Sequence, residues 1–85
     1  MDGSSLTEWL ALADAAPSAR AAAALLREHA APLRVVLVDA FDMRGETPAA
    51  VGQRRQLWWG ASDGHCWSVT TQGAQAAGLF VADRG

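Results

Sequence analysis

The sequence has one cysteine, and all of its seven basic residues are arginine. A single cysteine cannot form an internal disulfide, and a lone thiol fits a reducing cytoplasm. The first residues, Met-Asp-Gly-Ser-Ser, lack the basic and apolar regions of a signal peptide. No apolar run approaches the roughly 20 residues that span a bilayer. The bias toward arginine and alanine indicates GC-rich coding. Together with the lone thiol and the missing signal-peptide features, it leads us to expect a cytoplasmic bacterial protein without a membrane span.

Charge is also sparse, at 19% of residues with a net charge of −2, whereas apolar residues make up 51%. This composition is typical of a globular protein and argues against a general affinity for nucleic acid or anionic lipid. The 85 residues are enough for one domain, residues 1–85. A chain of this size buries only about 60% of the surface that its unfolded form exposes, so we expect a small core.

The stretch from Leu57 to Thr71 predicts a β-hairpin, because Asp63-Gly64 separates two apolar, β-prone runs. A two-residue loop would pair Ser62 with His65 and Gly60 with Trp67, and alternate pairs would share a face. One face would then carry Trp58, Gly60, Trp67 and Val69. The other would carry Leu57, Trp59, Ala61, Cys66, Ser68 and Thr70. We expect the first face to be core, with Trp67 lying over the bare backbone of Gly60.

The N-terminal part of the chain predicts two helices. Ser5 and Glu8 match a capping box, so a first helix is expected near residues 6–15. A second is expected over residues 18–31, with Pro17 in its first turn and Pro32 at its end. Its apolar stripe would be Ala22, Leu25, Leu26 and His29.

The remaining segments predict strands and loops. Residues 33–41 are apolar on both alternating faces, which favours a central strand, and residues 42–52 have the composition of a loop. Residues 72–78 predict a turn or short helix, and residues 79–82 a final strand. The expected fold is α+β, with two N-terminal helices packed on a small antiparallel sheet of three to four strands that includes the Trp-rich hairpin.

Two segments carry a resemblance to known proteins. Val35–Met43 is a strand followed by acidic residues, and residues 65–82 contain His-Cys, Val-Thr and Gly-Leu at a distinctive spacing. Over about the last 50 residues the chain resembles a family of small uncharacterised bacterial proteins, a domain of unknown function. That family's denser acidic cluster corresponds here only to Asp39 and Asp42. The resemblance implies a domain and carries no activity with it.

Several side chains suggest chemistry, although no motif names a reaction. His65, Cys66, Asp39 and Asp42 are all usable metal ligands, and a metal- or redox-responsive role for His65 and Cys66 is an alternative. Adjacent strand residues point to opposite faces, however, so one ion could not easily bind both. A nucleophilic Cys66 with His65 or His29 as its base, or an acid–base pair among Asp39, Asp42 and Glu46, lacks the usual supporting features. We expect no enzymatic activity, no cofactor and no metal.

A winged-helix-like DNA-binding regulator is the other alternative. Residues 67–77 resemble the final wing strand and the helix that follows it, and residues 47–56 could form a recognition helix that carries Arg54 and Arg55. The β-branched residues of 33–38 prefer a strand to the helix that this fold needs, and the chain is acidic. Binding to nucleic acid is therefore the weaker prediction.

The Trp-rich hairpin provides the leading functional prediction. Trp9, Trp58 and Trp67 are expected in the core, whereas Trp59 lies opposite Trp58 and could anchor an interface. We expect a small accessory or regulatory protein that binds a protein partner or a second copy of itself through its sheet. The candidate interface residues are Trp59, Leu57 and Arg55.

Overall fold

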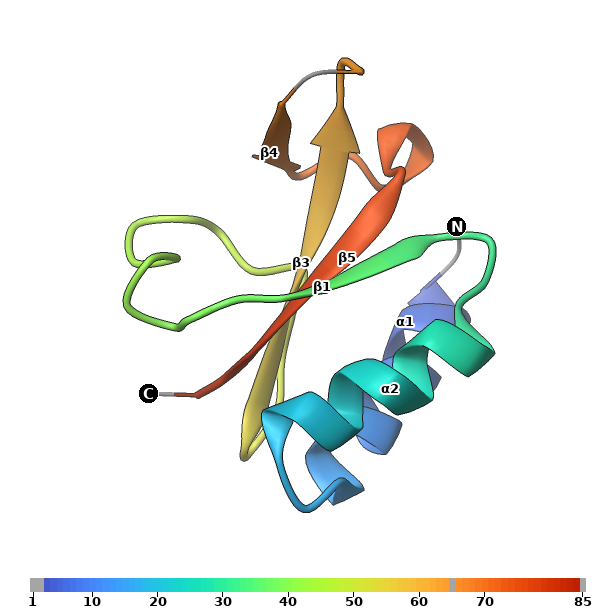
Figure 1. Cartoon of the computed structure of the whole chain (residues 1–85), viewed down its shortest axis with the longest axis vertical. Helices are drawn as coiled ribbons and strands as arrows, with labels where there is room; N and C mark the ends of the chain where they lie inside the picture. The colour runs from blue at the N-terminus through green and yellow to red at the C-terminus, as the bar shows by residue number, and fades with distance from the viewer. Residues whose placement is uncertain (1–2, 65, 85) are drawn as a thin grey trace.

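Two helices pack on one face of a mixed five-stranded sheet in the computed structural model, which describes residues 3–64 and 66–84 (Figure 1). The fold is α+β, as predicted. In chain order the elements are α1 (Gly3–Ala15), α2 (Ala19–His29), β1 (Arg34–Leu37), β2 (Ala50–Val51), β3 (Arg55–Ser62), β4 (Trp67–Thr70), the 3-10 turn η1 (Gly73–Gln75) and β5 (Gly78–Asp83). Among the described residues, no helix is long and apolar enough to cross a membrane.

Both predicted helices are present with shifted starts. α1 begins at Gly3, so Ser5 lies inside the helix and the expectation that it caps the helix is wrong. The N-cap of α2 is Ser18, whose Oγ accepts from the Ala21 N–H at 3.1 Å. Pro17 therefore precedes the cap instead of occupying the first turn. An extended cap residue with a side-chain acceptor satisfies a free helix N–H, which proline cannot do.

Strand β1 is shorter than predicted and lies at an edge of the sheet. It pairs in parallel with β5 alone, in the order β1-β5-β3-β2, so the expected central strand in an antiparallel sheet is wrong. Each of its faces nevertheless packs against an apolar cluster at its middle residues. Val35 packs against the helix side, and Val36 packs against a second apolar cluster on the opposite side. A strand with cover on both faces has the same apolar pattern wherever it lies in the sheet.

Strands β3 and β5 form the antiparallel centre of the sheet, with Trp58 paired to Phe80 and Trp59 to Leu79. β2 and β4 share the other edge of β3, β2 beside its first half and β4 beside its second. The sheet therefore has five strands in place of the predicted three to four, because residues 50–51, expected in a loop, pair with β3.

The predicted hairpin exists as β3 and β4, but its register differs by two residues. Ser62 pairs with Trp67 and Gly60 with Val69, which leaves Asp63–Cys66 as the loop in place of two residues. The Asp63 N–H donates to the Cys66 carbonyl at 3.3 Å, and the Asp63 Oδ1 accepts from the Cys66 N–H at 2.8 Å. The aspartate side chain thus closes a wider turn. A shift of two keeps every side chain on its predicted face.

The sheet separates two apolar clusters. The inner cluster lies between the sheet and the helices, and the outer cluster lies beneath the segment after β1. The inner cluster contains Trp9, Ala13, Ala16, Ala22, Ala23, Leu26, Ala30, Val35, Leu57, Trp59, Leu79 and Val81. The outer cluster contains Met43, Trp58, Phe80 and Ala82, with Val36, Val38, Ala40 and Val69 packed against it. Ala22 and Ala23 are buried in the inner cluster, so the small side chains of α2 allow it to approach its neighbours closely.

Candidate functional site

The three residues predicted to form an interface are buried on the helix side of the sheet. Trp59 is 7% exposed, Leu57 0% and Arg55 3%. Trp59 meets Trp9 of α1 edge-to-face, with ring centroids 6.3 Å apart. The expectation that these side chains form an exposed surface is therefore wrong. The helices cover the face that carries Leu57 and Trp59, so these residues are core.

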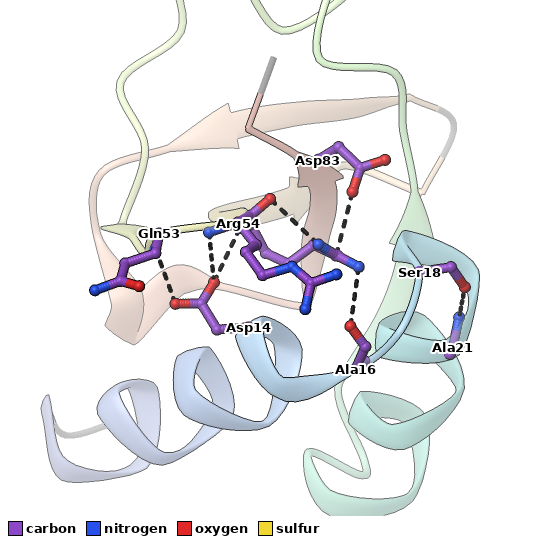
Figure 2. Close-up of polar contacts among 8 residues, drawn as sticks. Asp14, Ala16, Ser18, Ala21, Gln53, Arg54 and Asp83 are labelled. Atoms are coloured by element: carbon purple, nitrogen blue, oxygen red, sulfur yellow. Dashed lines mark hydrogen bonds and ion pairs between the residues drawn. The ribbon is translucent and has the colours of Figure 1, made fainter.

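Arg55 fastens strand β3 to the end of α1. Its Nη2 donates to the Ala16 carbonyl at 3.1 Å, and its Nε lies 3.3 Å from Oδ1 of Asp83 (Figure 2). The Nε–H is not aligned for a hydrogen bond among the described residues, so the contact with Asp83 is one of charge. A buried guanidinium with these partners is a structural element of the fold.

Asp14 holds the β2–β3 turn against α1. Its carboxylate accepts from the backbone N–H groups of Gln53 at 2.9 Å, Arg54 at 3.1 Å and Arg55 at 2.9 Å (Figure 2). Partial burial raises the pKa of Asp14, but these three hydrogen bonds and the nearby Arg55 charge outweigh it and lower the pKa below its usual value. A Cβ at Gly52 would collide with the Asp14 carboxylate, so the turn needs glycine there.

Two segments that the DNA-binding interpretation requires to be helices are strands and a turn. Residues 47–56, the expected recognition helix, contain strand β2, the turn and the start of β3, and residues 34–37 form strand β1. Arg54 contributes its backbone N–H to the contact with Asp14, and Arg55 is buried. The predicted pair of arginines therefore does not form a basic helix face.

The structure separates the predicted metal ligands. Cys66 is exposed and lies between β3 and β4, whereas Asp39 and Asp42 lie in the segment that follows β1. Figure 1 shows β4 at the top of the view and the segment after β1 on the left. His65 lies outside the described residues. Within those that are described, no group of three or more histidine, cysteine or acidic side chains could hold an ion. Asp39 and Asp42 follow the end of β1 that lies beside Val81, and Cys66 lies next to the opposite end of β3, so the structure does not bring these side chains together.

The exposed tryptophan is Trp67, on the outer face of the sheet. It is 37% exposed, so the expectation that it is core is wrong. Its ring lies across the glycines of two neighbouring strands, as the sequence predicted for the first of them. A Cβ at Gly60 or Gly78 would come within 3.1–3.2 Å of the Trp67 ring. Phe80 meets the ring edge-to-face at 6.0 Å. The indole is thus fixed in place while one part of it stays open to solvent.

Trp67 and Arg34 form the wall between two shallow hollows. The first, of about 400 Å³, is lined by Pro32, Arg34, Ser62, Gly64, Trp67 and Ala77. The second, of about 370 Å³, is lined by Arg27, Leu33, Arg34, Val35, Val36 and Trp67. Among the described lining residues, the charged ones are Arg27 and Arg34. We call this surface the Trp67 hollow.

A protrusion lies on the same outer face. The segment 39–46 leaves the end of β1 and covers the outer cluster through Met43, whose side chain is 9% exposed. Its tip carries Phe41, which at 68% is the most exposed large apolar side chain among the described residues. Arg44 stacks over the Phe41 ring at 4.5 Å. We call this segment the Phe41 loop.

The sequence contained one usable signal for the Trp67 hollow. Gly60 and Gly78 occupy adjacent strands in register, and paired glycines leave room for a ring above them. The alternation of the hairpin predicts that Trp67 lies over Gly60. It does not predict Gly78 or Arg34 there, because their position beside Trp67 depends on the parallel pairing of β1 with β5.

No protein-family model, curated protein or solved structure matches the chain. The resemblance of its C-terminal part to a bacterial family stays a prediction.

Proposed function

We propose that this protein is a non-enzymatic association protein that works through the outer face of its sheet. The observation that carries the proposal is Trp67, which is open to solvent yet held rigidly over Gly60 and Gly78 beside Arg34. Tryptophan and arginine are the residues that most often dominate binding energy at protein interfaces. A ring that is already fixed loses little side-chain entropy when a partner covers it.

The distribution of exposed apolar side chains supports the same face. Four large apolar side chains are exposed among the described residues, at Leu37, Phe41, Val51 and Trp67. Val51 pairs with Gln56, which places both on the face of Trp58 and Trp67. Phe41 extends from the loop that covers this face. Scattered apolar residues are ordinary on a surface, but several on one face favour an interaction site.

The helix side offers much less to a partner. Most large apolar side chains of that side are packed into the inner cluster, and Leu37, which pairs with Val81, is the exposed one there among the described strand residues. The exposed positions of α2 include Arg20, Arg27 and Glu28. A solvated, charged helix surface is the usual exterior of a small domain.

A cytoplasmic location belongs to this proposal too, since the one thiol is exposed and fits a reducing compartment.

Site-specific photocrosslinking in host cells tests the proposal. A photoreactive residue at Val51, on the outer face, should give crosslinked protein products. The same residue at Arg20, exposed on α2, is the matched control and should give far less. Trp67→Ala should reduce the yield at Val51 while the thermal melt still shows a folded chain, and Arg34→Ala provides a second variant. Equal yields from both positions, or yields unaffected by both variants, would contradict the proposal.

A further inference from the structure

We infer that the partner of the Trp67 hollow is the Phe41 loop of a second copy of this chain, in a symmetric dimer. This inference rests on the proposed function, because it identifies the occupant of that same face. The outer face combines a hollow walled by an exposed tryptophan with a protrusion tipped by an exposed phenylalanine. Tryptophan and phenylalanine rings pair favourably when their edges and faces meet.

The Phe41 loop is built to present its tip. The Asp39 Oδ1 accepts from the Phe41 N–H at 2.8 Å, and the Arg44 N–H donates to the Phe41 carbonyl at 3.3 Å. Met43 anchors the loop from below in the outer cluster. Phe41 is therefore held outward by backbone turns on both sides of it, and a partner would not have to order the loop. Preorganisation of this kind favours association.

The charges of the two surfaces are complementary. The segment 39–46 contains Asp39, Asp42, Glu46 and Arg44, three acids and one base, for a net charge of −2. Arg34 lines both parts of the Trp67 hollow and Arg27 lines the part next to the β1 edge, for a net charge of +2 among its described lining residues. Asp63 is the acid nearest to Trp67 in the sequence, and it accepts from the Cys66 N–H, whereas Glu28 follows Arg27 on α2. Each surface therefore attracts its counterpart on another copy, and like surfaces repel each other.

Symmetry allows both contacts at once. The hollow lies over the row Arg34, Gly78 and Gly60, whereas the loop covers the rows around Phe80 and Ala82 on the same face. A two-fold axis through the face would place each Phe41 loop on the other copy's hollow. Such an interface is isologous and closes at the dimer.

The free edge of β1 is the competing place for a second copy, and Arg27 protects it. The Arg27 guanidinium donates to the outward-facing Val35 carbonyl, at 3.3 Å from Nε and 3.2 Å from Nη2. A strand adding to this edge would have to displace those hydrogen bonds. Charged side chains on edge strands are a common defence against such pairing. The geometry therefore favours the face over the edge.

Sedimentation of the purified chain over a wide concentration range tests the inference. The wild-type chain should show a reversible monomer–dimer equilibrium that weakens as salt is added. Phe41→Ala and Trp67→Ala should each raise the dimer dissociation constant about 30-fold or more, as truncation of interface anchors does. Arg20→Ala, on the helix side, should leave it unchanged. Circular dichroism confirms that each variant is folded.

A charge exchange provides the sharper test. Arg34→Glu and Asp42→Arg should each abolish the homodimer, because each places like charges in both contacts of the symmetric interface. An equal mixture of the two variants should restore a mixed dimer, since one contact then carries the reversed pair and the other the original pair. Asp42 is chosen over Asp39 because the Asp39 side chain supports the loop itself. A mixture that stays monomeric would overturn the pairing.

The outcomes distinguish this inference from the proposed function. A chain that stays monomeric at all concentrations, yet crosslinks to another protein through Val51 in a Trp67-dependent way, overturns the dimer and supports the proposed function. A monomer without Trp67-dependent crosslinks overturns both. A dimer that ignores Phe41→Ala and Trp67→Ala but responds to Arg27→Ala overturns the face in favour of the β1 edge.

Discussion

Trp59 and Trp67 belong to the same hairpin and lie on opposite faces of the sheet, and their exposed fractions are 7% and 37%. The inner face is covered along its length by α1 and α2, whose alanines allow a close approach. The outer face is covered only in part, by the Phe41 loop. The cover on each face therefore determines which tryptophan is core and which is free to bind.

The quality of the two covers also differs. On the outer face, the buried Nε1–H of Trp58 has no hydrogen-bond partner among the described residues. A buried polar group without a partner is costly. The inner face also has one, the Arg55 Nε–H, but that group lies 3.3 Å from the Asp83 carboxylate, whereas Trp58 has no such charged neighbour among the contacts described. The helices, in contrast, are fixed to the sheet by the polar contacts of Asp14 and Arg55. We expect the inner face to carry stability and the outer face to carry association.

The largest effect should come from removing the inner tryptophan. Trp59→Ala should lower the free energy of unfolding by about 3–5 kcal/mol, because it leaves a large cavity against Trp9. Urea denaturation of the variant measures the loss, with Trp59→Phe as a control that keeps part of the volume. A loss below about 1 kcal/mol would mean that the inner face is not the stable one.

The next effect should come from the carboxylate that joins α1 to the β2–β3 turn. Asp14→Ala should cost about 2 kcal/mol at neutral pH, since three backbone N–H groups lose a charged acceptor. Asp14→Asn, which keeps one side-chain oxygen, should cost less. Chemical denaturation at neutral pH compares the two variants with the wild type.

The pH dependence of this contact follows from the direction in which folding shifts the pKa of Asp14. The pKa of Asp14 is lower in the folded chain than in the unfolded one, so folding is favoured when the carboxylate is ionised. Its stabilisation is fully present above the unfolded pKa, near 3.8, and is lost as the pH falls through the lowered folded value. The difference between wild type and Asp14→Ala should therefore shrink below that pH. A difference that grows on acidification would contradict this assignment.

Much of the fold could be predicted from local patterns, whereas the cover of each face could not. The alternation of residues 57–70 placed Trp58 and Trp59 on opposite faces correctly, because side-chain direction repeats every two residues. That pattern does not say which face the helices cover. Since the outer face also has an apolar cluster, Trp58 and Trp59 are both buried, and the one left open is Trp67.

Long-range pairing explains the other differences. The parallel pairing of β1 with β5 brings together residues 34–37 and 78–81, and no local pattern encodes this. It places Arg34 beside Trp67 and so creates the Trp67 hollow. The hairpin register differs from the predicted one because the Asp63 side chain accepts from the Cys66 N–H and closes a longer loop. The dipeptide Asp-Gly is compatible with both the shorter and the longer turn, so it does not decide between them.

A smaller effect on stability should follow from removing the outer tryptophan. Trp67→Ala should cost about 1–2 kcal/mol, less than Trp59→Ala, because the ring is partly solvated and covers only Gly60, Gly78 and Phe80. Its association, measured by sedimentation, should fall much more than its stability. If Trp67→Ala proved as destabilising as Trp59→Ala, the distinction between the two faces would fail.

The smallest effect should come from the turn that connects the two tryptophan-bearing strands. Gly64 has φ +97° and an added Cβ would meet nothing within 4 Å, so Gly64→Val should cost about 1 kcal/mol through backbone strain alone. Thermal unfolding measures the loss, and Gly45→Val is a matched control, since Gly45 has φ +87° and equally open surroundings. A D-alanine at position 64 should be stabilising instead, because it favours positive φ and restricts the unfolded chain. Gly64 lines the Trp67 hollow and Gly45 belongs to the Phe41 loop, so sedimentation of both L-variants also reports on the proposed interface. A Gly64→Val chain that is nearly as stable as the wild type but associates weakly would show that the turn holds Trp67 in place for its partner.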